Sequence, residues 1–200
     1  MGRRSAVWLV GALLAVAPLG AQGRLSKEDA DRFQSKLTKI VALGNQTAPK
    51  TTQARNTPLS DVEVNSYLKY RAGDQIPTGI VDPILSALGG GRVSGRAVVD
   101  LDAVRTQKKR GWMDPLGYLT GRLPVTASGV LTTKDGKGQF QLQSAEISGV
   151  TVPKSVLQEL VAYYSKSPEN PEGINMDAPF ELPAKIREIR VGAGTSTVVQ

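Results

Sequence analysis

Two carboxylates placed two residues apart, Asp100 and Asp102, are the first side chains whose type and spacing could support chemistry. On a strand they would share one face, about 6.6 Å apart along the chain. Such a pair could begin a Ca²⁺ site or a glycosidase pair, with Glu146 as a further candidate acid. No EF-hand spacing surrounds the pair, and no local pattern supplies a second catalytic acid. We therefore interpret the two aspartates as an ordinary solvated strand end.

The 200-residue chain contains no cysteine and no histidine, which excludes most other catalytic chemistry. Without histidine there is no Ser-His-Asp or Cys-His nucleophile and no imidazole base. Without cysteine there is no disulfide framework, and the usual ligand sets for zinc are absent. We expect a protein that is not an enzyme and that uses no metal or other cofactor. A carboxylate-based hydrolase stays open as an alternative.

A basic segment that runs directly into aromatic and aliphatic residues is the most suggestive candidate for binding. Tryptophan and tyrosine favour the boundary between polar and apolar surroundings, so the segment suits an anionic lipid surface or headgroup. The alternative is a crossover loop whose aromatic residues cover one end of a sheet. Nucleic acid is not expected as a partner, because the basic run is single and the overall charge is modest. We assign headgroup contact to Arg105, Lys108, Lys109 and Arg110, and ligand contact to Trp112, Tyr118 and Leu119.

The N-terminus has the three-part pattern of a secretory signal peptide. Residues 1–5 are basic, residues 6–19 are apolar, and small residues follow at Ala21 and Gly23. The apolar stretch is shorter than the ~20 residues that a membrane-spanning helix needs. We expect cleavage near Ala21 to Gly23 and export to the periplasm or the medium; the alternative is an uncleaved membrane tether. Cleavage lowers the formal net charge from +7 to +5, because 23 of the 25 cations remain against 18 acids.

Two helices are predicted in the first half of the mature chain. The first spans residues 26–44, with a serine cap at its start and one apolar face. Ser60 and Glu63 form the capping box of the second. In that second helix Tyr67 and Leu68 face inward, and we assign both to contact with an apolar ligand.

A further helix is predicted over residues 153–164, where apolar residues cover almost half of the circumference. Such a face is typical of a helix packed into a core. It would also suit a helix that lines an apolar cavity, and the sequence does not separate the two. On the second interpretation we assign ligand contact to Val156, Leu160 and Tyr164.

The periodicity changes from helical to two after the glycines at 89–91, which we expect to end a short helix over residues 82–88. An Asp-Gly pair at 135–136 predicts a hairpin turn. Beyond this turn the apolar residues move from even-numbered to odd-numbered positions, which predicts a β-bulge near residues 143–144. Alternating apolar residues predict strands over 92–101, 125–131, 140–147, 186–191 and 195–199.

The order of elements is helix, helix, strands, helix, strands, without regular alternation of strand and helix. This order favours an α+β fold in which a curved antiparallel sheet packs on two or three helices. We divide the chain into a signal peptide (1–23), an N-terminal helix with a polar linker (24–57) and a single α+β domain (58–200). The length is typical of one domain.

Three segments together carry a family resemblance. They are the helix opening Leu59-Ser-Asp-Val-Glu-Val-Asn-Ser-Tyr-Leu68, the helix after Val152-Pro153, and the strand entry Phe180-Glu-Leu-Pro-Ala-Lys-Ile186 with its continuation to Val191. They resemble small exported bacterial domains allied to the tubular lipid-binding (TULIP) superfamily, the YpmS-like group among them. The resemblance implies a curved antiparallel sheet wrapped on a long helix around a channel for acyl chains. Many members keep an N-terminal anchor, and the family supplies no catalytic residues.

We therefore expect an exported, non-enzymatic domain that binds a lipid or another apolar ligand, with a role in envelope maintenance. Peripheral contact with an anionic membrane is a further expectation. The alternative is a protein-interaction or assembly module with a solid core, which would meet its partner through an exposed apolar patch or sheet edge. A connected apolar cavity of ~300 Å³ or more favours the first hypothesis, and a filled core favours the second.

Overall fold

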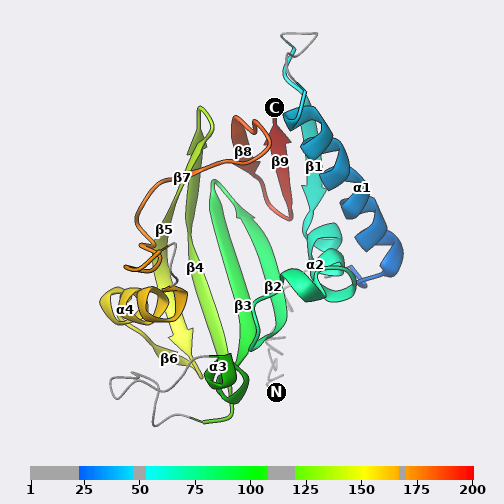
Figure 1. Cartoon of the computed structure of the whole chain (residues 1–200). Helices are drawn as coiled ribbons and strands as arrows, with labels where there is room; N and C mark the ends of the chain where they lie inside the picture. The colour runs from blue at the N-terminus through cyan, green and yellow to red at the C-terminus, as the bar shows by residue number, and fades with distance from the viewer. Residues whose placement is uncertain (1–22, 47–52, 108–119, 167–169) are drawn as a thin grey trace, which may run out of the picture.

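The computed structural model describes residues 23–46, 53–107, 120–166 and 170–200. Over these residues the chain forms two antiparallel sheets and four α-helices, so the predicted α+β class is confirmed (Figure 1). Residues 1–22, which hold nearly all of the predicted signal peptide, lie outside the described part. No helix in the described ranges is long and apolar enough to span a membrane.

Figure 1 shows how the two sheets and the helices are arranged. The helices are α1 (Lys27–Gly44), α2 (Asp61–Tyr70), α3 (Leu101–Gln107) and α4 (Lys154–Ser165), with a 3-10 turn at Gly73–Gln75. The smaller sheet has the order β1 (Asn56–Ser60), β9 (Thr195–Val199), β8 (Glu188–Val191). The larger, six-stranded sheet has the order β2 (Ile80–Gly89), β3 (Arg92–Asp100), β4 (Arg122–Lys134), β5 (Lys137–Ile147), β6 (Val150–Thr151), with β7 (Phe180–Glu181) also paired to β5.

Both predicted helix starts in the first half of the chain are confirmed. The Ser26 side chain accepts a hydrogen bond from the backbone N–H of Asp29 at the start of α1. At the start of α2 the capping box is complete, because Ser60 and Glu63 each accept from the other's backbone N–H. These signals are local, and each satisfies N–H groups that a helix leaves without a partner.

The predicted helix over residues 82–88 is wrong, because these residues belong to β2 and pair with β3. A register shift after Val81 leaves Asp82 and Pro83 in a bulge. Proline is tolerated at a bulge and on an edge strand, and β2 is the edge of its sheet. The glycines at 89–91 all have positive φ and form the hairpin turn from β2 to β3.

Two predicted features of the β4–β5 hairpin are confirmed. Asp135 and Gly136 have φ of 51° and 80°, which fits a type I′ turn. The register passes from Ser128 opposite Ser144 to Gly129 opposite Leu142, so residue 143 is the extra residue of a bulge. The bulge explains the change of parity in the apolar pattern.

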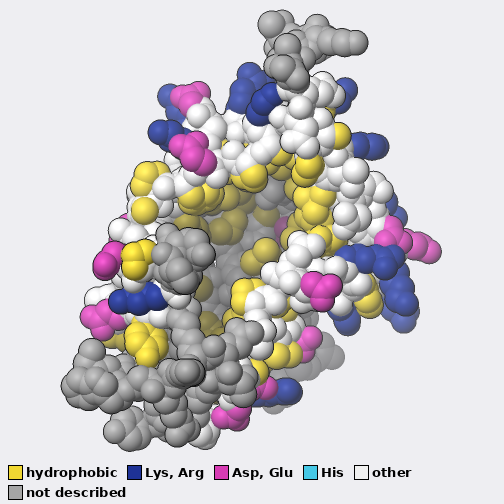
Figure 2. All heavy atoms as spheres, in the orientation of Figure 1, with side chains coloured by type: hydrophobic (Ala, Val, Ile, Leu, Met, Phe, Trp, Pro, Cys, Tyr) yellow, Lys and Arg dark blue, Asp and Glu magenta, His cyan; other side chains and the backbone are white. Residues whose placement is uncertain are grey.

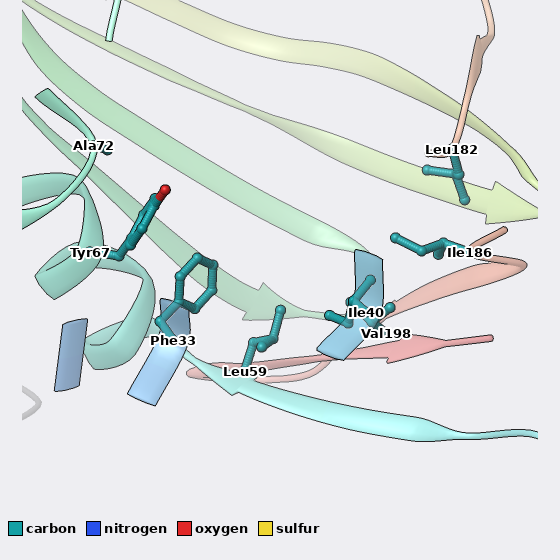
Figure 3. Packing of buried hydrophobic residues seen from close by; sticks show 8 residues of the cluster. All are labelled: Phe33, Ile40, Leu59, Tyr67, Ala72, Leu182, Ile186 and Val198. Atoms are coloured by element: carbon teal, nitrogen blue, oxygen red, sulfur yellow. The ribbon is translucent and has the colours of Figure 1, made fainter. Parts of the chain in front are cut away.

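The hydrophobic core lies on the side of α1, α2 and the smaller sheet (Figure 3). Phe33 of α1 and Tyr67 of α2 meet there, with ring centroids 5.0 Å apart. The long helix α1 thus packs on α2 and β1, and not inside the curve of the six-stranded sheet as the resemblance implied. The cluster comprises Phe33, Ile40, Leu59, Tyr67, Ala72, Leu182, Ile186 and Val198.

Glu63 is a buried carboxylate that joins α2 to α1. Its oxygens accept hydrogen bonds from Lys36 Nζ at 2.7 and 2.8 Å and from the backbone N–H of Ser60 at 2.9 Å. Burial raises the pKa of Glu63, but the bonds from Lys36 and Ser60 lower it by more, so the pKa lies below its ordinary 4.5. Folding therefore favours the ionised form.

We expect the protein to lose stability in acid as Glu63 takes up a proton. Because folding lowers its pKa, the stabilisation is complete above the unfolded-state pKa and is lost as pH falls through the folded-state pKa. At pH 7, Glu63→Gln should reduce the free energy of unfolding by about 2 kcal/mol. Urea unfolding of both proteins from pH 7 to pH 3 measures this, and a difference that stays constant over that range would contradict it.

Candidate functional site

The register of the six-stranded sheet places its apolar residues on one face, which we call the inner face. Paired residues of antiparallel strands share a face, as Ala127 does with Gly95 and Ala145. The opposite, outer face carries exposed polar residues such as Thr126 and Glu146. Outside the bulge of β2, the inner-face positions from the row of Leu123 to the row of Leu131 are all aliphatic, phenylalanine or glycine: Ile80, Leu85, Ala87, Val93, Gly95, Ala97, Val99, Leu123, Val125, Ala127, Gly129, Leu131, Phe140, Leu142, Ala145 and Ile147.

This inner face is only partly covered. Ala87, Gly129 and Ala145 are buried, whereas the others are half-buried and Leu85 is 48% exposed. The core cluster lies to one side of the face, and Figure 2 shows a hollow lined by hydrophobic side chains between the α1–α2 side and the β4–β5 side. A continuous, partly exposed apolar surface marks a binding site more often than a purely structural surface.

Contacts at the hairpin end show which elements approach the inner face. The Thr133 hydroxyl donates to the carbonyl of Ile189 at 3.0 Å and accepts from its N–H at 2.8 Å, which ties β4 to β8. Thr133 pairs with Gly138 of β5. The ring of Phe180 packs so closely on Gly138 that a Cβ atom added there would lie 2.6 Å from it. β8 and β7 therefore close one end of the inner face.

A cavity of about 820 Å³ opens beside the first half of β2. Its walls are the end of α2, the segment that follows it, the bulge of β2, and parts of β3 and β4. It shares Ile80, Ala97 and Val125 with the inner face. The volume lies within the ~300–1,000 Å³ usual for small-molecule sites, and charged residues share its walls with apolar ones.

Side chains of α2 hold the edge strand that forms one wall of this cavity. The Asn65 amide donates to the carbonyl of Leu85 and accepts from its N–H, both at 2.8 Å. Asp61 accepts from the N–H of Ala87 at 3.0 Å. An edge strand with open N–H and C=O groups invites pairing with another chain, and here side chains occupy several of those groups.

The structure does not bring the residues predicted to contact a ligand together at one site. Leu68 lines the cavity beside β2. Tyr67 is 7% exposed in the core, and its hydroxyl accepts from Gln75 Nε2 at 2.9 Å. Val156, which is 44% exposed, and Leu160, which is half-buried, lie on α4 beside β5. Sequence reasoning missed the walls of the cavity that β2 supplies, because it assigned that segment to a helix.

The remaining predicted contacts fall where side chains are not described. Tyr164 lies in α4 and Arg105 in α3, and only their backbone is described. The basic-aromatic segment therefore stays a prediction. Six of the residues to which a contact was assigned lie outside the described part of the chain: Lys108, Lys109, Arg110, Trp112, Tyr118 and Leu119.

The prediction that Asp100 and Asp102 share a strand face is wrong, because β3 ends at Asp100 and α3 begins with the next residue. Asp100 accepts from the N–H of Ala103 at 3.0 Å, as a helix cap does, and from Arg122 Nε at 3.0 Å. The Ala103 N–H and the Arg122 guanidinium hold the pKa of Asp100 below its ordinary value. Asp102 accepts from the N–H of Gly121 at 3.2 Å, so both carboxylates have structural partners.

Glu146 lies far from this pair. It is opposite Thr126 of β4, whereas Asp100 is opposite Arg122. The two β4 positions are about 13 Å apart at ~3.3 Å per residue. Glycosidase carboxylates lie about 5–10 Å apart. Among the described residues, no three acidic side chains gather as metal ligands. That the protein is not an enzyme stays a prediction.

The fold and the site define an α+β protein with an apolar sheet face and an adjoining cavity. No protein-family description and no curated protein matches the chain. Among solved structures it is similar to the crystal structure of lipopolysaccharide binding protein, with a TM-score of 0.23 and 14% identity. The similarity covers 78% of this chain and 45% of that chain, so the chain spans less than half of that protein's length. Such a TM-score does not establish a shared fold, and the TULIP resemblance stays a prediction.

Proposed function

We propose that the protein binds a lipid or another elongated apolar ligand along the inner face and in the adjoining cavity. The observation that carries the proposal is an inner face that is apolar outside the bulge of β2 and yet mostly only half-buried. Covering apolar surface is favourable by about 25 cal/mol per Å². A ligand that covers this face therefore gains affinity without polar contacts, and the cavity of about 820 Å³ offers room beside it.

Incubation with vesicles tests this function. We expect native mass spectrometry of the purified protein to show added lipid mass after incubation with phosphatidylcholine and phosphatidylglycerol vesicles. A sample incubated without vesicles is the control for lipid carried over from cells. A single ligand-free mass in both samples would contradict the proposal.

We also propose that binding takes place outside the cytoplasm. The basic, apolar and small-residue pattern of residues 1–23 supports export. The mass of the chain in the same spectra reports whether this segment has been removed. A full-length mass for protein from the periplasm or the medium would contradict cleavage.

One observation favours the alternative function, an interaction or assembly module. Several large apolar side chains near β5 are exposed to solvent. The exposed fractions are 68% for Val150, 53% for Ile174, 45% for Phe180 and 44% for Val156. The Ile174 segment lies along α4, because Gln158 donates to the Ile174 carbonyl at 2.9 Å. A protein partner could cover these side chains. Sedimentation at increasing concentration tests self-association through them, and a monomer throughout would contradict that form of the alternative.

A further inference from the structure

The cavity beside β2 contains charged groups as well as apolar walls. Arg96, Lys69 and Asp82 are its charged lining residues. Among the described residues, the side chain of Arg96 takes part in no ion pair or hydrogen bond. Lys69 Nζ lies 5.5 Å from the centroid of the Tyr70 ring, and within the described part of the chain it pairs with no carboxylate. The cavity therefore has two cations whose charge is not offset by an ion pair.

On the outer face of the sheet Arg96 has apolar neighbours on two sides, while Thr126 of β4 lies opposite it on a third. Ile84 of β2 lies directly opposite it, and Val98 lies two residues further along β3. Both neighbours also line the cavity. A guanidinium offers a planar fork of N–H donors that matches a carboxylate or a phosphate. Next to apolar walls, this geometry suits a molecule with an anionic end and an aliphatic chain.

We infer that the cavity takes a single-chain amphiphile whose anionic head, a carboxylate or a phosphate, meets Arg96. The inference rests on the proposed function, because the chain of the amphiphile uses the apolar walls. Lys69 adds a second positive charge. Asp82 also lines the cavity, in the bulge of β2, where its φ is 47°. Its negative charge repels the anionic head and weakens binding. A cavity of about 820 Å³ is within the size range of sites that bind one small molecule.

Calorimetric titration with decanoate, decyl phosphate and 1-decanol tests the inference. Arg96→Gln should weaken binding of the two anions about tenfold or more, because it removes a charged hydrogen-bond donor. It should change binding of 1-decanol less than twofold. Asp82→Asn should strengthen binding of the anions. Arg92→Gln is the matched control: Arg92 is exposed on the same face of β3 but does not line the cavity.

The outcomes separate this inference from the proposed function. If the protein binds 1-decanol and Arg96→Gln binds both anions as tightly as the unmodified protein, the role of Arg96 is overturned. Binding of apolar ligands is then still supported. Failure of the unmodified protein to bind all three ligands overturns both. Decanoate and decyl phosphate distinguish a carboxylate from a phosphate as the preferred head. Because Arg96 is exposed, the variant should fold, and its melting curve verifies this.

Discussion

Replacing Leu85 by aspartate is expected to abolish binding of apolar ligands while the protein stays folded. Leu85 lies on the inner face at the edge of the six-stranded sheet, and 48% of it is already exposed. A new carboxylate there can stay hydrated in the free protein, so the free energy of unfolding should fall by less than about 1 kcal/mol. A bound aliphatic chain would strip that hydration, and an unpaired buried charge is strongly unfavourable.

Titration with N-phenyl-1-naphthylamine, an apolar dye that fluoresces on leaving water, measures the effect. We expect the affinity of Leu85→Asp for the dye to fall more than tenfold. Thr132→Asp is the control, because Thr132 is exposed on the outer face away from the cavity and receives the same charge. Equal affinities of the unmodified protein and Leu85→Asp would show that the inner face is not where apolar molecules bind.

Replacing Asn65 by alanine is expected to destabilise the protein by about 2–4 kcal/mol. The Asn65 amide makes both a donor and an acceptor bond to the backbone of Leu85, and Asn65 is 7% exposed. Alanine would leave the N–H and C=O of the edge strand without partners, and each unpaired buried group costs about 1–3 kcal/mol.

Urea unfolding gives the free energy for this variant, and amide exchange locates the effect. The N–H of Leu85 should exchange faster in Asn65→Ala than in the unmodified protein, because its acceptor is gone. Lys69→Ala is the comparison on the exposed side of the same helix, with an expected change within about 0.5 kcal/mol. An unchanged unfolding midpoint for Asn65→Ala would mean that α2 does not hold the edge of β2.

Local features of the fold could be predicted because short-range bonds determine them. The caps at Ser26 and Ser60 satisfy helix N–H groups within three residues, and the turn at Asp135 and Gly136 depends on two positive φ angles. β2 could not be predicted in this way. Its residues have no strict alternation, because the bulge at Pro83 interrupts it, and its state depends on pairing with β3.

The candidate site was only partly accessible from the sequence for a related reason. Alternation shows that Val93, Val99 and Leu131 share a face with other apolar residues, but it does not show what covers that face. Tyr67 and Leu68 are neighbours on one helix, yet one lies in the core and the other lines the cavity. From the sequence, Arg96 is a polar residue on the solvent-exposed face of a strand. Only the three-dimensional arrangement places it beside Ile84 at a cavity.

Methyl resonances of the inner face provide the most direct test that an apolar ligand lies there. We expect titration of the protein with lipid to shift the methyl signals of Val99, Leu123 and Leu131, which lie on the inner face. The signals of Val130 on the outer face and Ile40 in the core should stay in place. Shifts confined to Val130, or no shifts at saturating lipid, would contradict a ligand on the inner face.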